Sequence, residues 1–278
     1  MSNQIIGLHD WFQTAPGQYL LQWEREQFDR TVANIFGYHA LQLGLPDIDT
    51  LQANRMPHRW LATGTAPRAA SGEAPEGALR SAVVMDFAAL PFPESSLDLL
   101  VLPHTLELNV DPHATLREVE RVLVPEGRAV ICGLNPASLW GMRQRRAHLY
   151  RRLGFGEPYL PDAGEFIGYW RLRDWLRLLS FEVESGSFGC YRPAVRSEKW
   201  LSRFEWMDRV GDRWWPIFGA VYFVVAVKRV RGIKLIAPAW KPAKAIATAP
   251  VPIANRLQRV TAVGTGARQE KDSELECH

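Results

Sequence analysis

Cysteines are scarce in this sequence, and their spacing excludes the common structural uses of that residue. Only Cys132, Cys190 and Cys277 occur among 278 residues, and no two of them form a CxxC pair. A disulfide-stapled secreted fold and a structural zinc site both need more closely spaced sets of ligands. The sequence therefore predicts no bound metal and a reducing, cytoplasmic setting.

Long apolar runs and targeting signals are also lacking. The longest apolar run covers 214–227 and contains a proline, whereas a helix needs about 20 apolar residues to cross a bilayer. The start of the chain has neither the basic region nor the apolar region of a signal peptide. We expect no transmembrane segment, and we expect this run to supply a buried strand.

Acidic residues are absent from one long stretch near the end of the chain. The net charge is only +3, yet nine basic residues and no acidic one lie between Lys228 and Gln269. Prolines and weak periodicity accompany them, which is typical of a solvated, largely disordered tail. Contact of this tail with nucleic acid or an anionic surface is the alternative interpretation.

Hydrophobic periodicity predicts alternating strands and helices. Apolar residues at helical spacing predict helices over 17–37, 111–123 and 171–180, the second with Asp111 as its N-cap and Pro112 at its first position. Short apolar runs predict strands over 39–44, 58–63, 78–87, 96–104, 128–134, 181–188 and 219–230. Strands that alternate with helices favour an α/β fold with a mainly parallel sheet and helices on both faces.

The most specific pattern lies between residues 83 and 136. Asp86 follows an apolar strand, "LPFPESSLD" occupies 90–98, and a strand to His104, the helix "LREVERVL" and "PEGRAVI" come next. This order resembles the class I S-adenosylmethionine-dependent methyltransferases of the type 11-like group. The whole chain is similar to a bacterial group of uncharacterised methyltransferase-like proteins that share "FGYH", "NPASLWG" and a basic tail.

The resemblance implies a fold and a division of the chain. The fold is α/β, with a Rossmann-like, mainly parallel seven-stranded sheet, an antiparallel last strand and helices on both faces. The implied parts are an N-terminal extension (1–16), a methyltransferase-like domain (17–231) with a substrate-side insertion at 137–165, and the tail (232–278).

The resemblance also implies a cofactor site for S-adenosylmethionine, the methyl donor, across the carboxyl ends of the strands. Asp86 would accept a hydrogen bond from the adenine amino group while Phe87 packs on the ring, although Asp86 could instead only cap a turn. His104 is a candidate general base, since the pKa of imidazole lies near neutrality, or a hydrogen-bonded wall of the pocket. The implied cofactor-binding residues are Leu43, Gly44, Leu45, Thr63, Asp86, Phe87, Pro103, His104 and Thr105.

Other polar residues in this half of the chain have either a functional or a structural interpretation. Glu107 is a weaker candidate of the same kind as His104, whereas Asp98 opens a strand and is expected to be structural. Asn135 is expected to be a turn residue that faces the substrate side. The arginines of the 137–165 segment either receive an anionic substrate or form a solvated helix face: Arg143, Arg145, Arg146, Arg151 and Arg152.

The resemblance fails at the first glycine-rich turn, which is degenerate in this chain. Gln42 stands where the family has an acid, Gly44 is the one glycine of the turn, and Pro46 removes a backbone donor. Thr63 and Thr65 stand where an acid would hold the ribose hydroxyls. Two hypotheses follow, a working methyltransferase of unknown acceptor with a weakened cofactor site, or an inactive methyltransferase-fold protein that binds partners through its arginines and tail.

Overall fold

The computed structural model describes residues 8–64, 82–152, 159–160 and 164–230, which all lie within one compact unit, Met1–Gly232. Thr65 and the predicted basic tail fall outside these residues.

A single seven-stranded sheet organises this unit, in the order β3-β2-β1-β4-β5-β7-β6. The pairs from β3 through to β5 are parallel, and β7 runs antiparallel to both β5 and β6. This arrangement confirms the predicted Rossmann-like sheet, including its antiparallel last strand. The strands are β1 (His39–Leu43), β2 (His58–Thr63), β3 (Ala82–Val84), β4 (Leu97–Pro103), β5 (Leu123–Leu134), β6 (Phe181–Gly189) and β7 (Val221–Lys228).

Alternation along the strands divides the core into two layers, one on each face of the sheet. On β4, Leu99 and Val101 join one hydrophobic cluster while Leu100 and Leu102 join the other. Successive side chains of a strand point to opposite faces, so strands buried on both sides read as continuous apolar runs.

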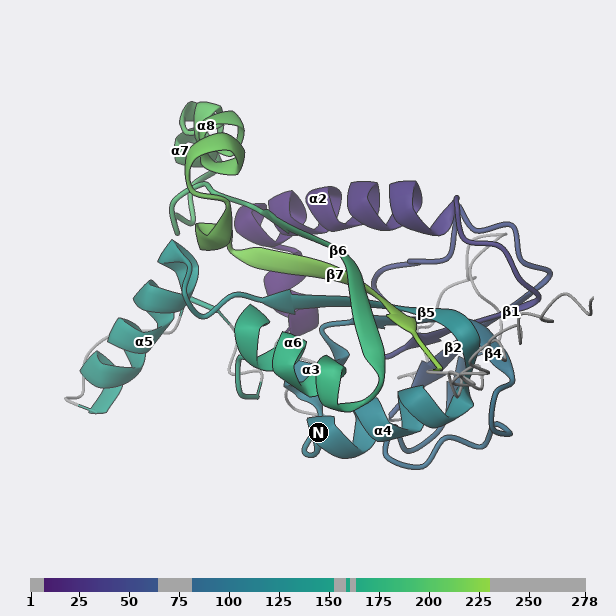
Figure 1. Ribbon diagram of the computed structural model, residues 1–278. Coiled ribbons are helices and arrows are strands. Elements are labelled where there is room, and N and C mark those ends of the chain that lie inside the picture. Colours follow the sequence, from purple (N-terminus) through teal and green to yellow (C-terminus); the bar gives the residue numbers. More distant parts are fainter. Residues whose placement is uncertain (1–7, 65–81, 153–158, 161–163, 231–278) are drawn as a thin grey trace, which may run out of the picture. The chain divides into compact units, whose positions relative to one another are not determined.

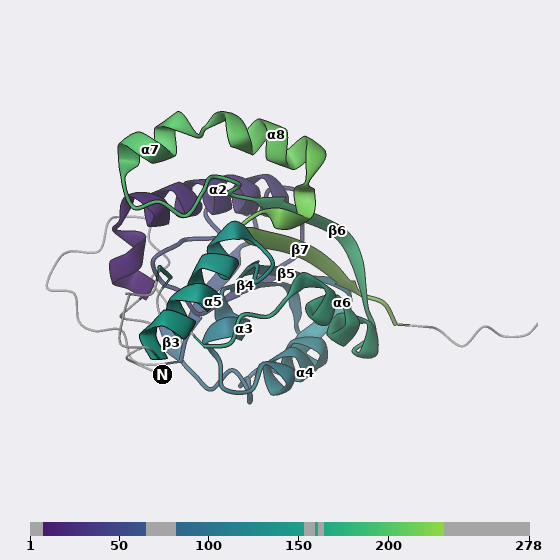
Figure 2. The ribbon, with the colours of Figure 1, turned by 90° about the vertical axis from the view of Figure 1, so that its left-hand side faces the viewer.

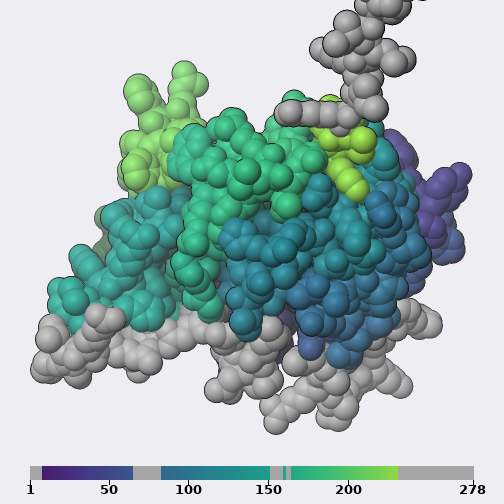
Figure 3. Space-filling model, turned by 60° about the horizontal axis from the view of Figure 1, so that its bottom comes forward, coloured from purple at the N-terminus to yellow at the C-terminus, as the bar shows by residue number. Residues whose placement is uncertain are grey.

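Helices cover both faces of the sheet, as predicted (Figure 1). Helix α2 (Ala15–Val32) lies on one face, where Phe28 packs edge-on against Phe223 of β7 with their ring centroids 5.0 Å apart. Helices α4 (Pro112–Val122) and α6 (Tyr169–Leu178) cover the other face, which Figure 3 brings forward. The remaining helices are α3 (Thr105–Leu108), α5 (Leu139–Arg152), α7 (Glu198–Arg203), α8 (Trp206–Trp214) and the 3-10 turn η1 (Pro216–Phe218).

The predicted N-cap of α4 is confirmed. The Asp111 carboxylate accepts a hydrogen bond from the backbone N–H of Ala114 at 2.9 Å, and Pro112 is the first helical residue. The core also extends further toward the N-terminus than the predicted boundary at residue 17. Leu8 and Phe12, which lie in a short helical stretch, are buried against the α2 face.

The structure defines three further segments, of which the last differs from the sequence-based interpretation. The parallel strands β1 and β2 are joined by turns alone over 44–57, all of which the structure describes, where a crossover helix is usual. The arginine-rich segment after β5 forms helix α5. The apolar run 214–227 is not one strand, because Trp214 ends α8 and only Val221 onward belongs to β7; α7 and α8 form a ridge beside α2 (Figure 2).

Candidate functional site

Several of the predicted cofactor residues meet at the carboxyl edge of the sheet, where the strand order reverses between β1 and β4. In open α/β sheets this is where ligands bind. Gly44 follows β1 with a φ of +78°, and a Cβ built on it would lie 3.3 Å from the Thr105 hydroxyl and 3.8 Å from the Phe87 ring. A Cβ built on Gly64, which follows β2, would also lie 3.8 Å from that ring. Two residues without side chains therefore border the ring of Phe87.

Asp86 lies in the same region, directly after β3, and its side chain is exposed. Its Oδ1 accepts a hydrogen bond from the backbone N–H of Ala88 at 2.9 Å, so the turn-capping role is present. A carboxylate has about four lone-pair sites, so this bond leaves the side chain able to accept another donor. The two roles considered for Asp86 are compatible.

Thr63, at the end of β2, contributes a polar atom without a partner. Its hydroxyl oxygen is buried and has no hydrogen-bond partner among the described residues. A buried hydroxyl without a partner costs free energy. This atom stands at the strand end where the family resemblance places the ribose, and a ligand hydroxyl could satisfy it.

The other predicted cofactor residues are buried and can offer little beyond backbone atoms. Leu43, Leu45 and Pro103 have buried side chains, and Leu45 packs into the α2-side core. The hydroxyl of Thr105 donates to the carbonyl of Leu43, which joins the ends of β4 and β1.

Gln42, which replaces the expected acid, holds the turn that follows it. The side chain is fully buried, and its amide nitrogen donates to the carbonyls of Leu45 at 2.9 Å and Ile48 at 2.7 Å. Its amide oxygen accepts from the N–H of Thr50 at 3.0 Å and from the Thr50 hydroxyl at 2.8 Å. A carboxylate has no N–H to donate, so only an amide can make this set of bonds.

His104 lies in a buried ionic cluster and not on an open pocket wall. Its Nε2 is 2.7 Å from Glu24 Oε1 on α2, and its Nδ1 is 3.2 Å from Glu107 Oε2. These carboxylates raise the pKa of His104 to about 10, against the opposing effect of burial, which is the largest single contribution. The imidazole is 1% exposed. Both ring nitrogens face carboxylates, so His104 is a hydrogen-bonded residue of the core, and its role as a general base stays a prediction.

The same cluster contains Glu107, which the sequence offered as a candidate, and Glu24, which it did not. Glu107 is buried, which raises the pKa of its carboxyl, and its Oε1 accepts from the N–H of Leu134. Glu24 was not predicted at all. Its signal in the sequence was its spacing, because Glu24 lies four residues from both Leu20 and Phe28 on the buried face of α2.

Asp98 has the structural role expected of it, and Asn135 lies in a turn, as expected. Oδ2 of Asp98 accepts from the N–H groups of Tyr38 at 2.8 Å and His39 at 2.9 Å, which fixes the start of β1. Asn135 accepts from the N–H of Ala137 at 3.0 Å within a turn, and its amide donates to the carbonyl of Gly219 at 2.9 Å.

The arginines of the 137–165 segment lie on α5 and are not one surface. Arg143 donates to the carbonyl of Ala194 and lies over the Tyr159 ring, 4.8 Å from its centroid. Arg145 and Arg146 are exposed. The side chains of Arg151 and Arg152 lie outside the described part of the structure. Among the helices that the structure describes, none has the length and apolar character needed to cross a bilayer.

Comparison with known proteins relates this geometry to a family. Residues 60–131, about a quarter of the chain, match the family model described as a methyltransferase domain. The uncharacterized protein YafS of Escherichia coli (strain K12) is 43% identical over 94 residues, which is 34% of this chain and 36% of that protein. The biotin biosynthesis bifunctional protein BioHC of Saccharophagus degradans is 30% identical over 138 residues, which is 49% of this chain and 24% of that protein. The chain thus spans only about a quarter to a third of the length of these relatives.

A solved structure supports the fold over a longer stretch. The Thermotoga maritima protein described as an S-adenosylmethionine-dependent methyltransferase, possible histamine N-methyltransferase, superposes with a TM-score of 0.55. The match covers 80% of this chain and 94% of that chain at 14% identity. At such low identity the likeness shows the fold, since one fold can serve many reactions.

Proposed function

We propose that this chain is a class I S-adenosylmethionine-dependent methyltransferase, as its match to a methyltransferase domain and its fold support. In this proposal it binds S-adenosylmethionine at the carboxyl edge of its sheet and transfers the methyl group to an acceptor. The observation that carries the proposal is the meeting of Gly44, Gly64 and Phe87 at the switch in strand order. A side chain at either glycine would occupy space beside the ring that a ligand needs.

Each residue at this edge has a role that its position supports. Phe87, partly exposed, packs on the adenine ring, and the Asp86 carboxylate accepts from the adenine amino group. The buried hydroxyl of Thr63 bonds a ribose hydroxyl in place of the usual acid, and Gly44 lets the backbone approach the ligand. The bound donor supplies an activated methyl group, and the chain supplies its position relative to the acceptor.

The cofactor site is weaker than that of a family member with an acid on the ribose. A hydrogen bond to a charged group contributes about 1.5–3 kcal/mol, so its replacement by a hydroxyl lowers affinity roughly tenfold or more. The site therefore binds its donor loosely, which is compatible with turnover at sufficient donor concentration.

The cysteines and the exposed arginines bear on the cellular setting and on the acceptor. Both described cysteines are free thiols, which supports a reducing, cytoplasmic setting. The exposed Arg145 and Arg146 of α5 would attract an anionic acceptor. A contact of the basic tail with nucleic acid or an anionic surface stays a proposal from charge alone.

A thermal shift assay with S-adenosylmethionine and S-adenosylhomocysteine tests the proposal. Ligand that binds only the folded state stabilises it by about 2.7 kcal/mol at one hundred times its Kd, so a rise in Tm that grows with ligand concentration is expected. The absence of any shift at millimolar concentrations of both ligands would refute cofactor binding. That outcome would favour the second hypothesis, a methyltransferase fold that acts only by binding partners.

A further inference from the structure

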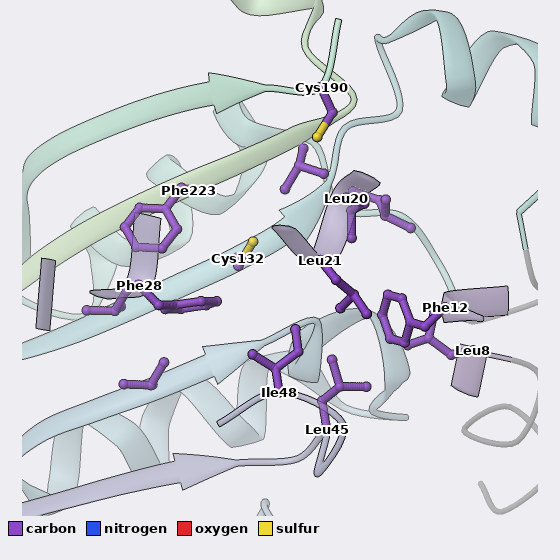
Figure 4. Close-up of a cluster of buried hydrophobic side chains, with 14 of the residues drawn as sticks. Leu8, Phe12, Leu20, Leu21, Phe28, Leu45, Ile48, Cys132, Cys190 and Phe223 are labelled. Atoms are coloured by element: carbon purple, nitrogen blue, oxygen red, sulfur yellow. The ribbon is translucent and has the colours of Figure 1, made fainter. Parts of the chain in front are cut away.

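Three side chains that can ligate metals meet in the core between α2 and the sheet. Glu24 comes from α2, His104 follows β4, and Cys132 lies on β5, so they are far apart in the sequence. Their ligand atoms all lie within 4.8 Å of one another. Glu24 Oε1 is 2.7 Å from His104 Nε2 and 3.3 Å from Cys132 Sγ. Figure 4 shows Cys132 in the buried layer among side chains of α2.

The hydrogen bonds of this cluster leave one of its atoms unsatisfied. Oε2 of Glu24 is buried and has no hydrogen-bond partner among the described residues. Buried carboxylates normally have partners for both oxygens or bind a cation. Two carboxylates, Glu24 and Glu107, also share the one imidazole of His104.

Glu107 orients the imidazole as a second-layer carboxylate would in a metal site. It bonds His104 Nδ1 at 3.2 Å and is itself fixed by the N–H of Leu134. In metalloproteins a ligating histidine usually donates its other ring N–H to a carboxylate or carbonyl, which fixes the ring. Here that bond directs Nε2 toward Glu24 and Cys132.

We propose that Glu24, His104 and Cys132 bind one divalent transition-metal ion, with zinc as the cation that this mixed nitrogen, oxygen and sulfur set suits best. A thiolate and a carboxylate balance the two charges of the ion, and the imidazole binds as the neutral ring. Binding releases the thiol proton of Cys132 and one imidazolium proton to solvent. The carboxylate of Glu24 can bind through both oxygens, which provides Oε2 with a partner.

Metal binding requires the three side chains to adjust, because their ligand atoms are spread over up to 4.8 Å. Bonds of about 2.0–2.3 Å in a tetrahedral arrangement place ligand atoms roughly 3.3–3.5 Å apart. The Glu24–Cys132 distance of 3.3 Å already agrees, and the Glu24–His104 distance of 2.7 Å must lengthen by a few tenths of an ångström. Such an ion would fasten α2 to the ends of β4 and β5. The inference is independent of cofactor binding.

Cobalt substitution of the full-length protein tests the site. Cobalt bound to a thiolate gives a charge-transfer absorption in the near ultraviolet, and we expect it at one equivalent of metal per chain. Cys132→Ser should abolish the band and weaken zinc binding at least tenfold. Cys190→Ser should retain the band and the zinc affinity, because Cys190 is as buried as Cys132 but lies outside the cluster. Cys277→Ser should retain them as well.

X-ray absorption of the zinc-loaded wild-type protein tests the same site without any variant. One sulfur and otherwise nitrogen or oxygen ligands around zinc would support the proposal even if Cys132→Ser fails to fold. Zinc ligands without sulfur, a cobalt band that persists in Cys132→Ser, or no metal uptake after refolding with zinc would each overturn it.

Discussion

At the scale of single residues, Gln42 shows why a lost motif need not be a loss of structure. From the sequence alone, glutamine in place of the first-strand acid predicts a degenerate cofactor loop. In the structure that amide bonds three residues of the turn, Leu45, Ile48 and Thr50, and so stabilises a connection that has no helix. Gln42 therefore supports the turn that carries Gly44.

Gln42→Glu should destabilise the protein strongly. The substitution removes the only donor of the side chain, leaves the carbonyls of Leu45 and Ile48 without it, and places a charge in a fully buried position. Each unsatisfied group costs about 1–3 kcal/mol, and urea unfolding measures the sum. The same exchange at Gln52, which is exposed in the same connection, should change stability by less than about 0.5 kcal/mol. Equal stability of the two variants would contradict the role of Gln42.

Asp86→Asn should weaken S-adenosylhomocysteine binding without unfolding the protein. The amide keeps an oxygen for the turn with Ala88 but loses the charge that strengthens a bond to the adenine amino group. Loss of a charged bond of about 1.5–3 kcal/mol predicts a Kd at least tenfold higher, which isothermal calorimetry can measure. Glu94→Gln, in the same exposed connection before β4, is the control and should bind like the wild type.

At the scale of elements, α4 fixes the segment that carries Asp86 and Phe87. Glu118 Oε2 accepts from the N–H of Leu90 at 2.9 Å, and Arg121 donates to the carbonyls of Leu90 at 2.9 Å and Phe92 at 3.0 Å. The two side chains also pair with each other at 2.7 Å. The position of Asp86 and Phe87, which we propose to hold the adenine, therefore depends on side chains of α4.

This tether predicts a specific pH dependence. The hydrogen bond from Arg121 lowers the pKa of Glu118 below its ordinary value of 4.5. A carboxyl group whose pKa is lowered by folding stabilises the protein above its unfolded pKa, and this contribution disappears as the pH falls through the folded pKa. The stability difference between wild type and Glu118→Gln should therefore be present near neutral pH and shrink below about pH 4. Urea unfolding across this range measures it.

Glu120→Gln is the matched control for that series. Residues two apart on a helix do not face each other, so Glu120 points away from the Leu90 segment. Its substitution should leave the pH dependence of stability as in the wild type. If the difference in unfolding free energy between wild type and Glu118→Gln stayed constant from neutral to acid pH, the charge of Glu118 would contribute nothing to stability.

The sequence predicted correctly those helices and strands whose signals lie within their own residues. The helix after Asp111 and the strand to His104 were correct because caps and apolar periodicity are local signals. Helices α7 and α8 were missed because Trp214 joins an apolar run that continues into β7, and composition cannot divide such a run. The Glu24–His104–Cys132 cluster was missed because its members meet only through the sheet topology.

At the scale of the whole molecule, the sheet carries two separate groups of polar residues, one exposed at its carboxyl edge and one buried under α2. The carboxyl edge carries the exposed Asp86 and the half-buried Phe87 and Gly44, where a ligand can approach. The α2 face carries a buried ionic cluster that solvent does not reach. His104 and Thr105 are adjacent in the chain after β4, but they have different partners. The side chain of His104 lies in the buried cluster with Glu24, whereas the hydroxyl of Thr105 donates to the carbonyl of Leu43 at the carboxyl edge of the sheet.

The central claim is that the edge formed by Gly44, Gly64, Asp86 and Phe87 holds the methyl donor. A crystal structure of the full chain grown with S-adenosylhomocysteine tests it most directly. We predict density for the adenine ring against Phe87, with its amino group within hydrogen-bond distance of the Asp86 carboxylate. An empty edge in crystals grown at millimolar ligand, or ligand bound elsewhere on the molecule, would contradict the claim.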